Sequence, residues 1–141
     1  MKDEVIGYDI AAIDATTLQV LNEPNRAAET KSQAYCIRGG PPGKKVTLFE
    51  YNGGYKPHVY THSDYVKDTL CGFSGKLACD ASPVFDGIGN TDDITLSYCH
   101  AHARRKFEAI EKTRRKLKGK KGKPGLAYYV MRQIYQPLYR I

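Results

Sequence analysis

Two aspartates are the residues of this sequence best suited to binding a metal ion. Asp14 and Asp80 each lie in a short apolar, strand-like run. An ionised carboxylate in such a run is costly unless it is paired or bound to a metal. Carboxylate oxygens suit Mg²⁺, which prefers hard oxygen ligands and keeps several waters. Taken singly, either aspartate is explained more simply as a turn-capping or solvent-facing residue, so a metal site requires a fold that brings the two together.

A second group that could do chemistry is the Cys-x-x-His pair Cys99 and His102, which follows the apolar run 94–98. Cysteine and histidine bind zinc, but a tetrahedral site needs four ligands, or three and a water. His58 and His62 could complete it only if the fold brought them close, so a closed zinc site is not expected. Two interpretations remain: a strand-end thiol beside a locally hydrogen-bonded His102, or a role for His102 near a reacting phosphate.

The positive charge is concentrated in one segment. The formal net charge is +7 at pH 7, and residues 104–123 hold eleven Lys or Arg against only Glu108 and Glu111. A solvated helix end is one explanation, but the lack of balancing acids favours a polyanion such as nucleic acid. Arginine forks bind phosphate without reading base sequence. The residues expected to contact DNA are Arg104, Arg105, Lys106, Arg114, Arg115 and Lys116.

The remaining composition limits the function classes. A chain of 141 residues is about one domain, and its four cysteines contain no Cys-x-x-Cys pair, so reduced thiols are expected. No run approaches the roughly 20 apolar residues of a membrane span, and no signal peptide is evident. Phosphate-loop and nucleophile-elbow motifs are also missing. We therefore expect a soluble, intracellular protein.

Hydrophobic periodicity and turn signals predict five strands and three helices. The strands are expected over 10–21, 32–38, 45–51, 76–80 and 94–98, and the helices over 63–70, with Ser63 as its N-cap, 101–117 and 126–141. Two apolar stripes at helical spacing are expected to be the packed faces of the last two helices. They are Ala103, Phe107, Ile110 and Leu117, and then Leu126, Val130, Ile134, Leu138 and Ile141.

This order of elements predicts an α/β fold with a mixed sheet: a three-stranded antiparallel meander followed by β-α units. The order fits a ribonuclease-H-like core, in which the first and fourth strands are neighbours, so Asp14 and Asp80 would meet. We predict a core over 1–118, a basic linker over 119–125 and a C-terminal helix over 126–141.

Four stretches carry a resemblance to a known family. They are Ile-Asp-Ala-Thr-Thr-Leu-Gln-Val-Leu-Asn-Glu-Pro (13–24), Tyr-Cys-Ile-Arg-Gly-Gly-Pro-Pro-Gly-Lys (35–44), Lys-Leu-Ala-Cys-Asp (76–80) and Cys-His-Ala-His-Ala-Arg-Arg-Lys-Phe (99–107). Together they resemble the catalytic domain of insertion-sequence-66 family transposases, and the resemblance covers nearly the whole chain.

The resemblance implies a ribonuclease-H-like core with a DDE triad of metal-binding carboxylates. Such an enzyme cuts DNA at transposon ends by hydrolysis and joins the 3′-hydroxyl to a target phosphodiester. Asp14 would be the first acid and Asp80 the second, with His102 in the motif that follows. The implied cofactor is Mg²⁺, with Mn²⁺ as a substitute and Zn²⁺ less expected. The implied partners are transposon-end and target DNA, and a second copy of the chain.

The sequence departs from the family pattern in three places. Asp-Ala-Thr-Thr (14–17) replaces Asp-Glu-Thr-Pro, and Cys-Asp-Ala-Ser (79–82) replaces Thr-Asp-Gly-Tyr. The family's third acid, a glutamate, is expected beyond Ile141, and Glu108 and Glu111 are not expected to replace it. We therefore expect a truncated form, lacking also the family's N-terminal zinc-binding region, with weak or no catalysis. The alternatives are a non-catalytic, basic DNA-binding remnant and a small Cys/His metal-binding module.

Overall fold

The computed structural model describes residues 2–24, 27–52, 62–89, 93–116 and 124–139. The chain forms two compact units, Met1–Tyr98 and Cys99–Ile141, and each is considered by itself. The sequence-based prediction of one core through residue 118 placed the boundary further along the chain. No helix among the described residues is both long and apolar enough to cross a membrane.

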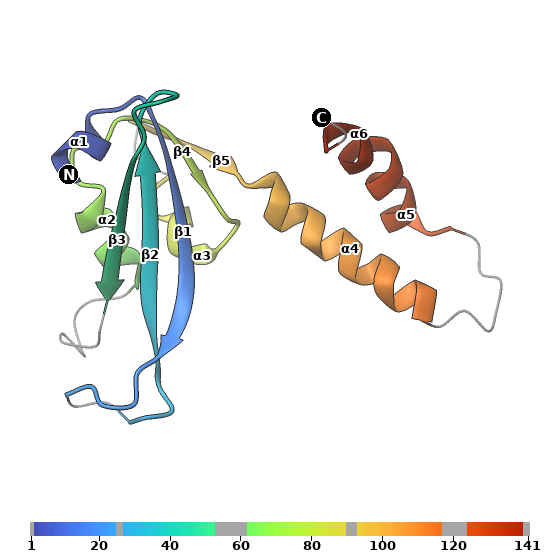
Figure 1. Cartoon of the computed structure of the whole chain (residues 1–141), viewed down its shortest axis with the longest axis horizontal. Helices are drawn as coiled ribbons and strands as arrows, with labels where there is room; N and C mark the ends of the chain where they lie inside the picture. Colours follow the sequence, from blue (N-terminus) through green and yellow to red (C-terminus); the bar gives the residue numbers. More distant parts are fainter. Residues whose placement is uncertain (1, 25–26, 53–61, 90–92, 117–123, 140–141) are drawn as a thin grey trace. The chain divides into compact units, whose positions relative to one another are not determined.

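The first unit is built on a five-stranded mixed sheet (Figure 1). Its strands are β1 (Ile10–Gln19), β2 (Lys31–Gly39), β3 (Val46–Asn52), β4 (Gly75–Cys79) and β5 (Ile94–Tyr98). Their order in the sheet is β3-β2-β1-β4-β5. Strands β1, β2 and β3 form the antiparallel meander, whereas β4 runs parallel to both β1 and β5. The predicted mixed sheet and the predicted adjacency of the first and fourth strands are therefore both confirmed.

Three short helices accompany this sheet: α1 (Lys2–Ile6), α2 (His62–Thr69) and α3 (Pro83–Asp86). In the view of Figure 1, α2 and α3 lie behind the strands. The predicted helix over 63–70 is confirmed, but it begins at His62, so Ser63 is not its N-cap. Helices α1 and α3 were not predicted, because elements of five and four residues are too short for a hydrophobic period to show.

Alternate residues of the strands form the core. Ala11 and Ile13 of β1 are buried, and so are Leu77 and Cys79 of β4. Val5, Val66 and Phe85 of the helices complete this layer, together with Leu70, Phe73 and Ile88 of the segments that follow α2 and α3. Because side chains alternate across a strand, the residues between these point to the opposite face, and Asp14 is among them. One face of the sheet thus holds the core and the other carries the polar candidates.

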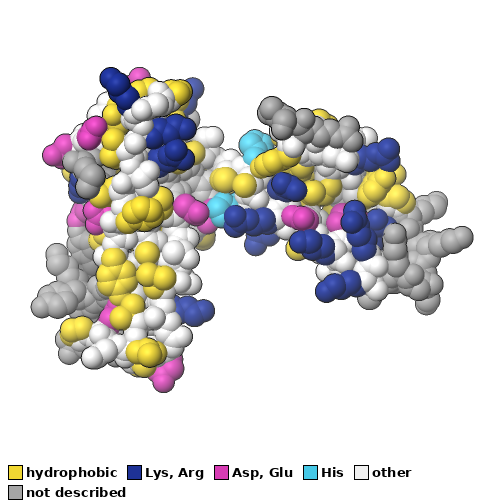
Figure 2. Space-filling model, in the orientation of Figure 1, with side chains coloured by type: hydrophobic (Ala, Val, Ile, Leu, Met, Phe, Trp, Pro, Cys, Tyr) yellow, Lys and Arg dark blue, Asp and Glu magenta, His cyan; other side chains and the backbone are white. Residues whose placement is uncertain are grey.

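The opposite face of the sheet, which we call the outer face, is exposed. Phe49 and Tyr51 of β3 are 77% and 46% exposed, and Ile10 of β1 is 64% exposed. Figure 2 shows hydrophobic side chains gathered over strands β1 to β3 on this side. The register joins Asp14 to Cys36 and Cys36 to Phe49, so Asp14 lies on this same face, with the aromatic residues two strands away.

The second unit is helical. Helix α4 (His100–Lys116) is followed by α5 (Leu126–Val130), a π-helical turn η1 (Met131–Tyr135) and α6 (Gln136–Leu138). The helix predicted over 126–141 is therefore confirmed as far as Leu138, but its middle turn is π rather than α. Pro137 explains the change of helix type, because proline has no N–H to donate and its ring clashes with the carbonyl four residues earlier.

The two predicted apolar stripes are not the packed faces of these helices. Ile110 is 57% exposed on α4, and Leu126, Ile134 and Leu138 are also exposed. The buried residues of the unit are instead Glu111, Ala127 and Tyr135. The helices meet through aromatic and charged side chains, and a hydrophobic period cannot identify such a contact. Leu117 and Ile141, which end the predicted stripes, lie outside the described residues.

Candidate metal site and nucleic-acid interface

The two predicted acids lie on neighbouring parallel strands. Asp14 is in β1, and Asp80 follows directly after β4. The register between these strands pairs Ala11 with Leu77 and Ala12 with Ala78. Continued by two residues, the same register places Asp14 opposite Asp80. The hydrogen-bonded pairing of β1 with β4 ends at Ala12 and Ala78. The two carboxylates therefore lie two residues beyond the last paired residues.

The surroundings of the two carboxylates differ. Asp14 is exposed, and its Oδ1 accepts a hydrogen bond of 3.0 Å from the backbone N–H of Ala15. Asp80 is half-buried. Its Oδ1 is buried and accepts no hydrogen bond within the described part of the chain. A buried carboxylate oxygen without a donor is unfavourable, and a cation would relieve that cost.

These two residues fit a hard divalent cation such as Mg²⁺. Mg²⁺ is commonly held by one or two carboxylates together with waters and substrate phosphates, and Asp14 and Asp80 supply two carboxylates at one edge of the pairing. Among the described residues there is no cluster of three or more His, Cys, Asp or Glu side chains able to hold a metal ion.

A groove on the outer face lies beside the two acids. Its volume is about 620 Å³. Its lining includes Ile10, Ala12 and Ala78 of the sheet, the side chains of Arg38 and Lys45, and the loop Gly39–Pro42. Arg38 pairs with Ala12, and Ala12 with Ala78, which puts the groove floor two residues before Asp14 and Asp80 along their strands.

The loop that walls this groove depends on Gly40. Its φ of +99° favours glycine, and a Cβ there would collide with the carbonyl oxygen of Lys44. Sequence reasoning used the string Arg-Gly-Gly-Pro-Pro-Gly only as a family marker and missed Arg38 as a site residue. Strand alternation was the available signal, because it places Arg38 on the same face of β2 as Cys36, two residues away. The register, which pairs Cys36 with Asp14, then puts Arg38 on the face that carries Asp14.

Cys99 and His102 belong to the second unit. The carbonyl oxygen of Cys99 accepts hydrogen bonds from the backbone N–H of His102, at 3.1 Å, and of Ala103, at 3.2 Å. Cys99 therefore directly precedes α4 and accepts its first hydrogen bonds, and the helix begins at His100, one residue before the predicted Ala101. The catalytic role of His102 stays a prediction. His58 and the side chain of His62 lie outside the described residues.

The six predicted DNA-contacting residues of α4 separate into different environments. Arg105, Lys106, Arg115 and Lys116 are exposed, whereas Arg104 and Arg114 are half-buried. Arg114 forms a bidentate ion pair with Glu111, through two hydrogen bonds of 2.9 Å. These hydrogen bonds raise the pKa of Arg114 above its ordinary value. Arg114 is therefore engaged within its own helix, and the exposed cations are better placed to meet phosphate.

Comparisons with known proteins bear on the whole chain. A family model described as "Transposase IS66 family" matches residues 1–141. No curated protein matches the sequence. Among solved structures, a chain of the simian T-cell lymphotropic virus intasome in complex with PP2A regulatory subunit B56 gamma shows 12% identity and a TM-score of 0.40. That match covers 92% of this chain and 50% of the other, so the protein spans about half of the viral-complex chain, and similarity at this level does not establish a shared fold.

Proposed function

The chain belongs to the IS66 family of transposases, and from that premise we propose that it acts in DNA transposition through a ribonuclease-H-like core whose Asp14 and Asp80 hold Mg²⁺. The observation that carries the proposal is the parallel register of β1 and β4, which pairs Ala12 with Ala78 and, continued by two residues, sets Asp14 opposite Asp80. Their position on the exposed outer face leaves room for a DNA backbone.

The two acids have different parts in this proposal. Asp80, with its buried Oδ1, is the more fixed ligand, and the exposed Asp14 completes the pair. When bound, divalent metal ions stabilise the charge that develops on the attacking and leaving oxygens of phosphoryl transfer. In end cleavage the attacking oxygen comes from water, and in strand transfer it comes from the 3′-hydroxyl. In each case a P–O bond forms to the attacking oxygen, which loses its proton, and the bond from phosphorus to a 3′-oxygen breaks, so that this oxygen leaves as a 3′-hydroxyl.

The cations near the acids would position the DNA. Arg38 and Lys45 line the groove beside Asp14 and Asp80, where they can hold the phosphates that flank the reacting one. On α4, Arg105, Lys112 and Lys116 are exposed and share one side, because they are spaced at seven and four residues on a helix. We assign this strip to sequence-independent contact with duplex phosphates.

A second function, a non-catalytic DNA-binding remnant, rests on a different observation. Exposed cations line α4, and contact between such cations and phosphates requires no metal ion. In that case the basic strip of α4 would still bind DNA, and Asp14 and Asp80 would have no metal to hold.

Titration calorimetry with Mn²⁺ on the intact chain separates the two functions. We expect one site whose affinity falls at least about tenfold in Asp14→Asn and in Asp80→Asn, since each removes a charged ligand. Asp86→Asn is the matched control, because Asp86 is an exposed aspartate of α3. Circular dichroism checks that each variant is folded. An intact chain that takes up no Mn²⁺ contradicts the metal-dependent proposal and leaves the remnant.

A further inference from the structure

A groove inside the second unit combines arginines with tyrosines. It lies between α4 and the C-terminal helix, which pack together, and its volume is about 690 Å³. The lining residues are Arg104, Glu108, Glu111, Lys112, Arg115, Tyr128, Met131, Arg132, Tyr135, Gln136 and Tyr139. From α4, the stripe 104, 108, 111 and 115 faces the groove, at the spacing of one helix side.

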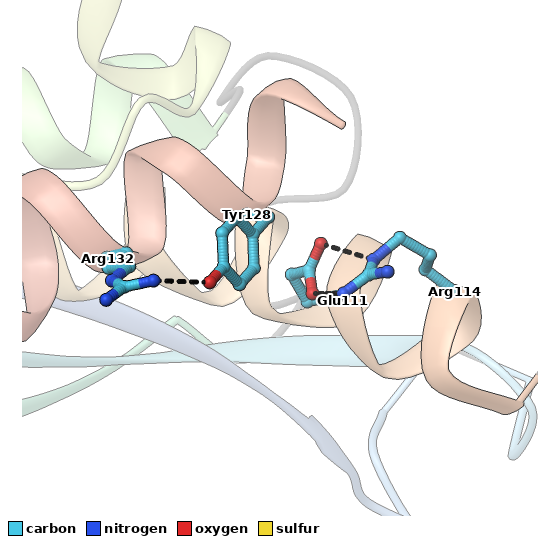
Figure 3. Close-up of polar contacts among 4 residues, drawn as sticks. All are labelled: Glu111, Arg114, Tyr128 and Arg132. Atoms are coloured by element: carbon cyan, nitrogen blue, oxygen red, sulfur yellow. Dashed lines mark hydrogen bonds and ion pairs between the residues drawn. The ribbon is translucent and has the colours of Figure 1, made fainter. Parts of the chain in front are cut away.

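The charge of this groove is positive. Four cations line it, against the carboxylates Glu108 and Glu111. Glu111 is already paired with Arg114 (Figure 3), and Glu108 lies 3.6 Å from Lys112. The carboxylates are thus largely matched by neighbours on their own helix. Arg104, Arg115 and Arg132 remain as an excess of guanidinium groups around the groove.

The tyrosine rings are held in defined positions by these cations. The guanidinium of Arg104 lies 4.5 Å above the centre of the Tyr139 ring. Nη1 of Arg132 donates a hydrogen bond of 2.8 Å to the Tyr128 hydroxyl, as Figure 3 shows. Tyr135 is buried and contacts Phe107, with ring centres 6.1 Å apart. Tyr139 is 50% exposed, so its ring keeps open surface in the groove.

One donor in the groove lacks an acceptor. Nε of Arg104 is buried and makes no hydrogen bond to any described residue. A buried guanidinium N–H without an acceptor is unfavourable. A phosphate oxygen, or the acceptor edge of a base, would satisfy it.

We propose that this groove binds single-stranded DNA, with a base stacked on Tyr139 and the adjoining phosphates held by Arg104, Arg115 and Arg132. The proposal rests on the proposed function, which supplies DNA as the partner. Sequence-tolerant binding of single strands combines a cationic track with aromatic rings on which bases stack, and both are present here.

A duplex does not fit this groove. The axes of packed helices lie about 8–10 Å apart. The space between two such helices is therefore narrower than the major groove of B-DNA, which is roughly 12 Å wide, and a whole duplex is wider than its major groove. In a duplex the base faces are also covered by stacking. Only an unpaired nucleotide can present a base face to Tyr139. This groove therefore differs from the exposed strip Arg105, Lys112 and Lys116, which we assigned to duplex phosphates, although Lys112 also lines the groove.

The test compares single-stranded and duplex binding in variants of Tyr139. Fluorescence anisotropy with a 5′-labelled mixed-sequence oligonucleotide, alone and annealed, gives Kd for the intact chain over a range of NaCl. We expect Tyr139→Ala to weaken single-strand binding by about five- to a hundred-fold, the range for loss of one stacked base. Duplex affinity should stay within about twofold, and the salt slope should not change, because no charge is removed.

Three further variants keep the result interpretable. Tyr139→Phe retains the ring and should bind single strands nearly as well as the unaltered chain. Tyr129→Ala removes a tyrosine of similar exposure, 46%, that does not line the groove, and it should leave both affinities unchanged. Arg115→Gln should reduce the single-strand salt slope by about 0.7.

Contrary outcomes fall into two kinds. The inference is overturned if the intact chain binds DNA and Tyr139→Ala binds single-stranded DNA with unchanged affinity. It is also overturned if Tyr139→Ala loses affinity for single-stranded and duplex DNA equally. In both cases DNA remains the partner. If the intact chain binds neither form, the DNA partner fails and the inference fails with it. Mn²⁺ binding by Asp14 and Asp80 is measured without DNA, so it is decided independently.

Discussion

The two units of this protein bury opposite kinds of residue. In the first unit the fully buried side chains are mainly apolar, such as Val66, Leu77 and Phe85, and the charged candidates stand on the outer face. In the second unit Glu111 is buried, and the helices meet around guanidinium groups and tyrosines. The first unit keeps its charged side chains outside its core, whereas the second unit packs its helices through charged and aromatic side chains.

The difference separates two sources of stability. Apolar burial is non-directional and gives about 1.5–3 kcal/mol for each fully buried large side chain. Ion pairs and ring–cation contacts depend on geometry and weaken with salt when partly exposed. The first unit can therefore hold Asp14 and Asp80 in a fixed frame. The second unit retains polar groups that a ligand can engage.

The comparison predicts that the largest loss of stability follows from removing a buried aromatic ring of the first unit. Phe85→Ala should lower the free energy of unfolding by about 3–5 kcal/mol, through lost burial and the cavity left behind. The matched control is Phe49→Ala, which removes an equal ring that is 77% exposed and should change stability by about 0.5 kcal/mol or less. Urea unfolding of the intact chain measures both. Equal losses would show that the outer face is covered in solution, contrary to the comparison.

A smaller effect is expected from the ion pair of the second unit. Glu111→Gln removes the carboxylate that binds Arg114 through two hydrogen bonds of 2.9 Å. We expect about 1–3 kcal/mol of local destabilisation, because a buried charged partner is lost. Hydrogen exchange followed by mass spectrometry should show faster exchange over 100–116 and 124–139, with 10–19 and 75–79 unchanged.

Glu108→Gln is the control for that experiment. Its carboxylate is 37% exposed and lies 3.6 Å from Lys112, so its removal should change exchange by less than about 0.5 kcal/mol. If Glu108→Gln and Glu111→Gln behave alike, the buried ion pair has no special part in the packing of the second unit.

The smallest effect concerns a polar contact at the border of the first core. Burial and a hydrogen bond of 3.0 Å to Glu50 raise the pKa of Tyr65 to about 12 from its ordinary 10.0. An unfolded tyrosine loses its proton near pH 10, while folded Tyr65 keeps it to about pH 12. The stabilisation is therefore complete below pH 10 and is lost as the pH rises from 10 to 12.

Tyr65→Phe tests that contribution. Between pH 9 and pH 11 the unaltered chain should lose more stability in urea than Tyr65→Phe does, by about 0.5–1 kcal/mol, the net worth of one hydrogen bond. Tyr98→Phe, at a residue 52% exposed, should follow the unaltered chain. If the stability of all three proteins depends on pH in the same way, the Tyr65 hydroxyl does not stabilise the fold.

The sequence by itself determined most of the local elements and offered two acids as candidates. All five strands were predicted, because β-branched and apolar runs between glycine and proline turns leave few alternatives. The adjacency of the first and fourth strands also followed from the element order. The short helices α1 and α3 were missed, since four or five residues carry no period. The apolar runs made Asp14 and Asp80 candidates only, and their role as metal-binding acids stays a prediction.

Only the tertiary structure decided which faces are used. Periodicity gave an apolar stripe on α4 and on the C-terminal helix, yet Ile110 and Ile134 are exposed, and the helices meet through Arg104, Glu111 and Tyr135. The parallel register that sets Asp14 level with Asp80, and the diagonal position of Arg38, are likewise long-range. Local sequence fixes backbone preference within a few residues, whereas a partner across a sheet or a helix pair is chosen by the packing of segments far apart in the chain.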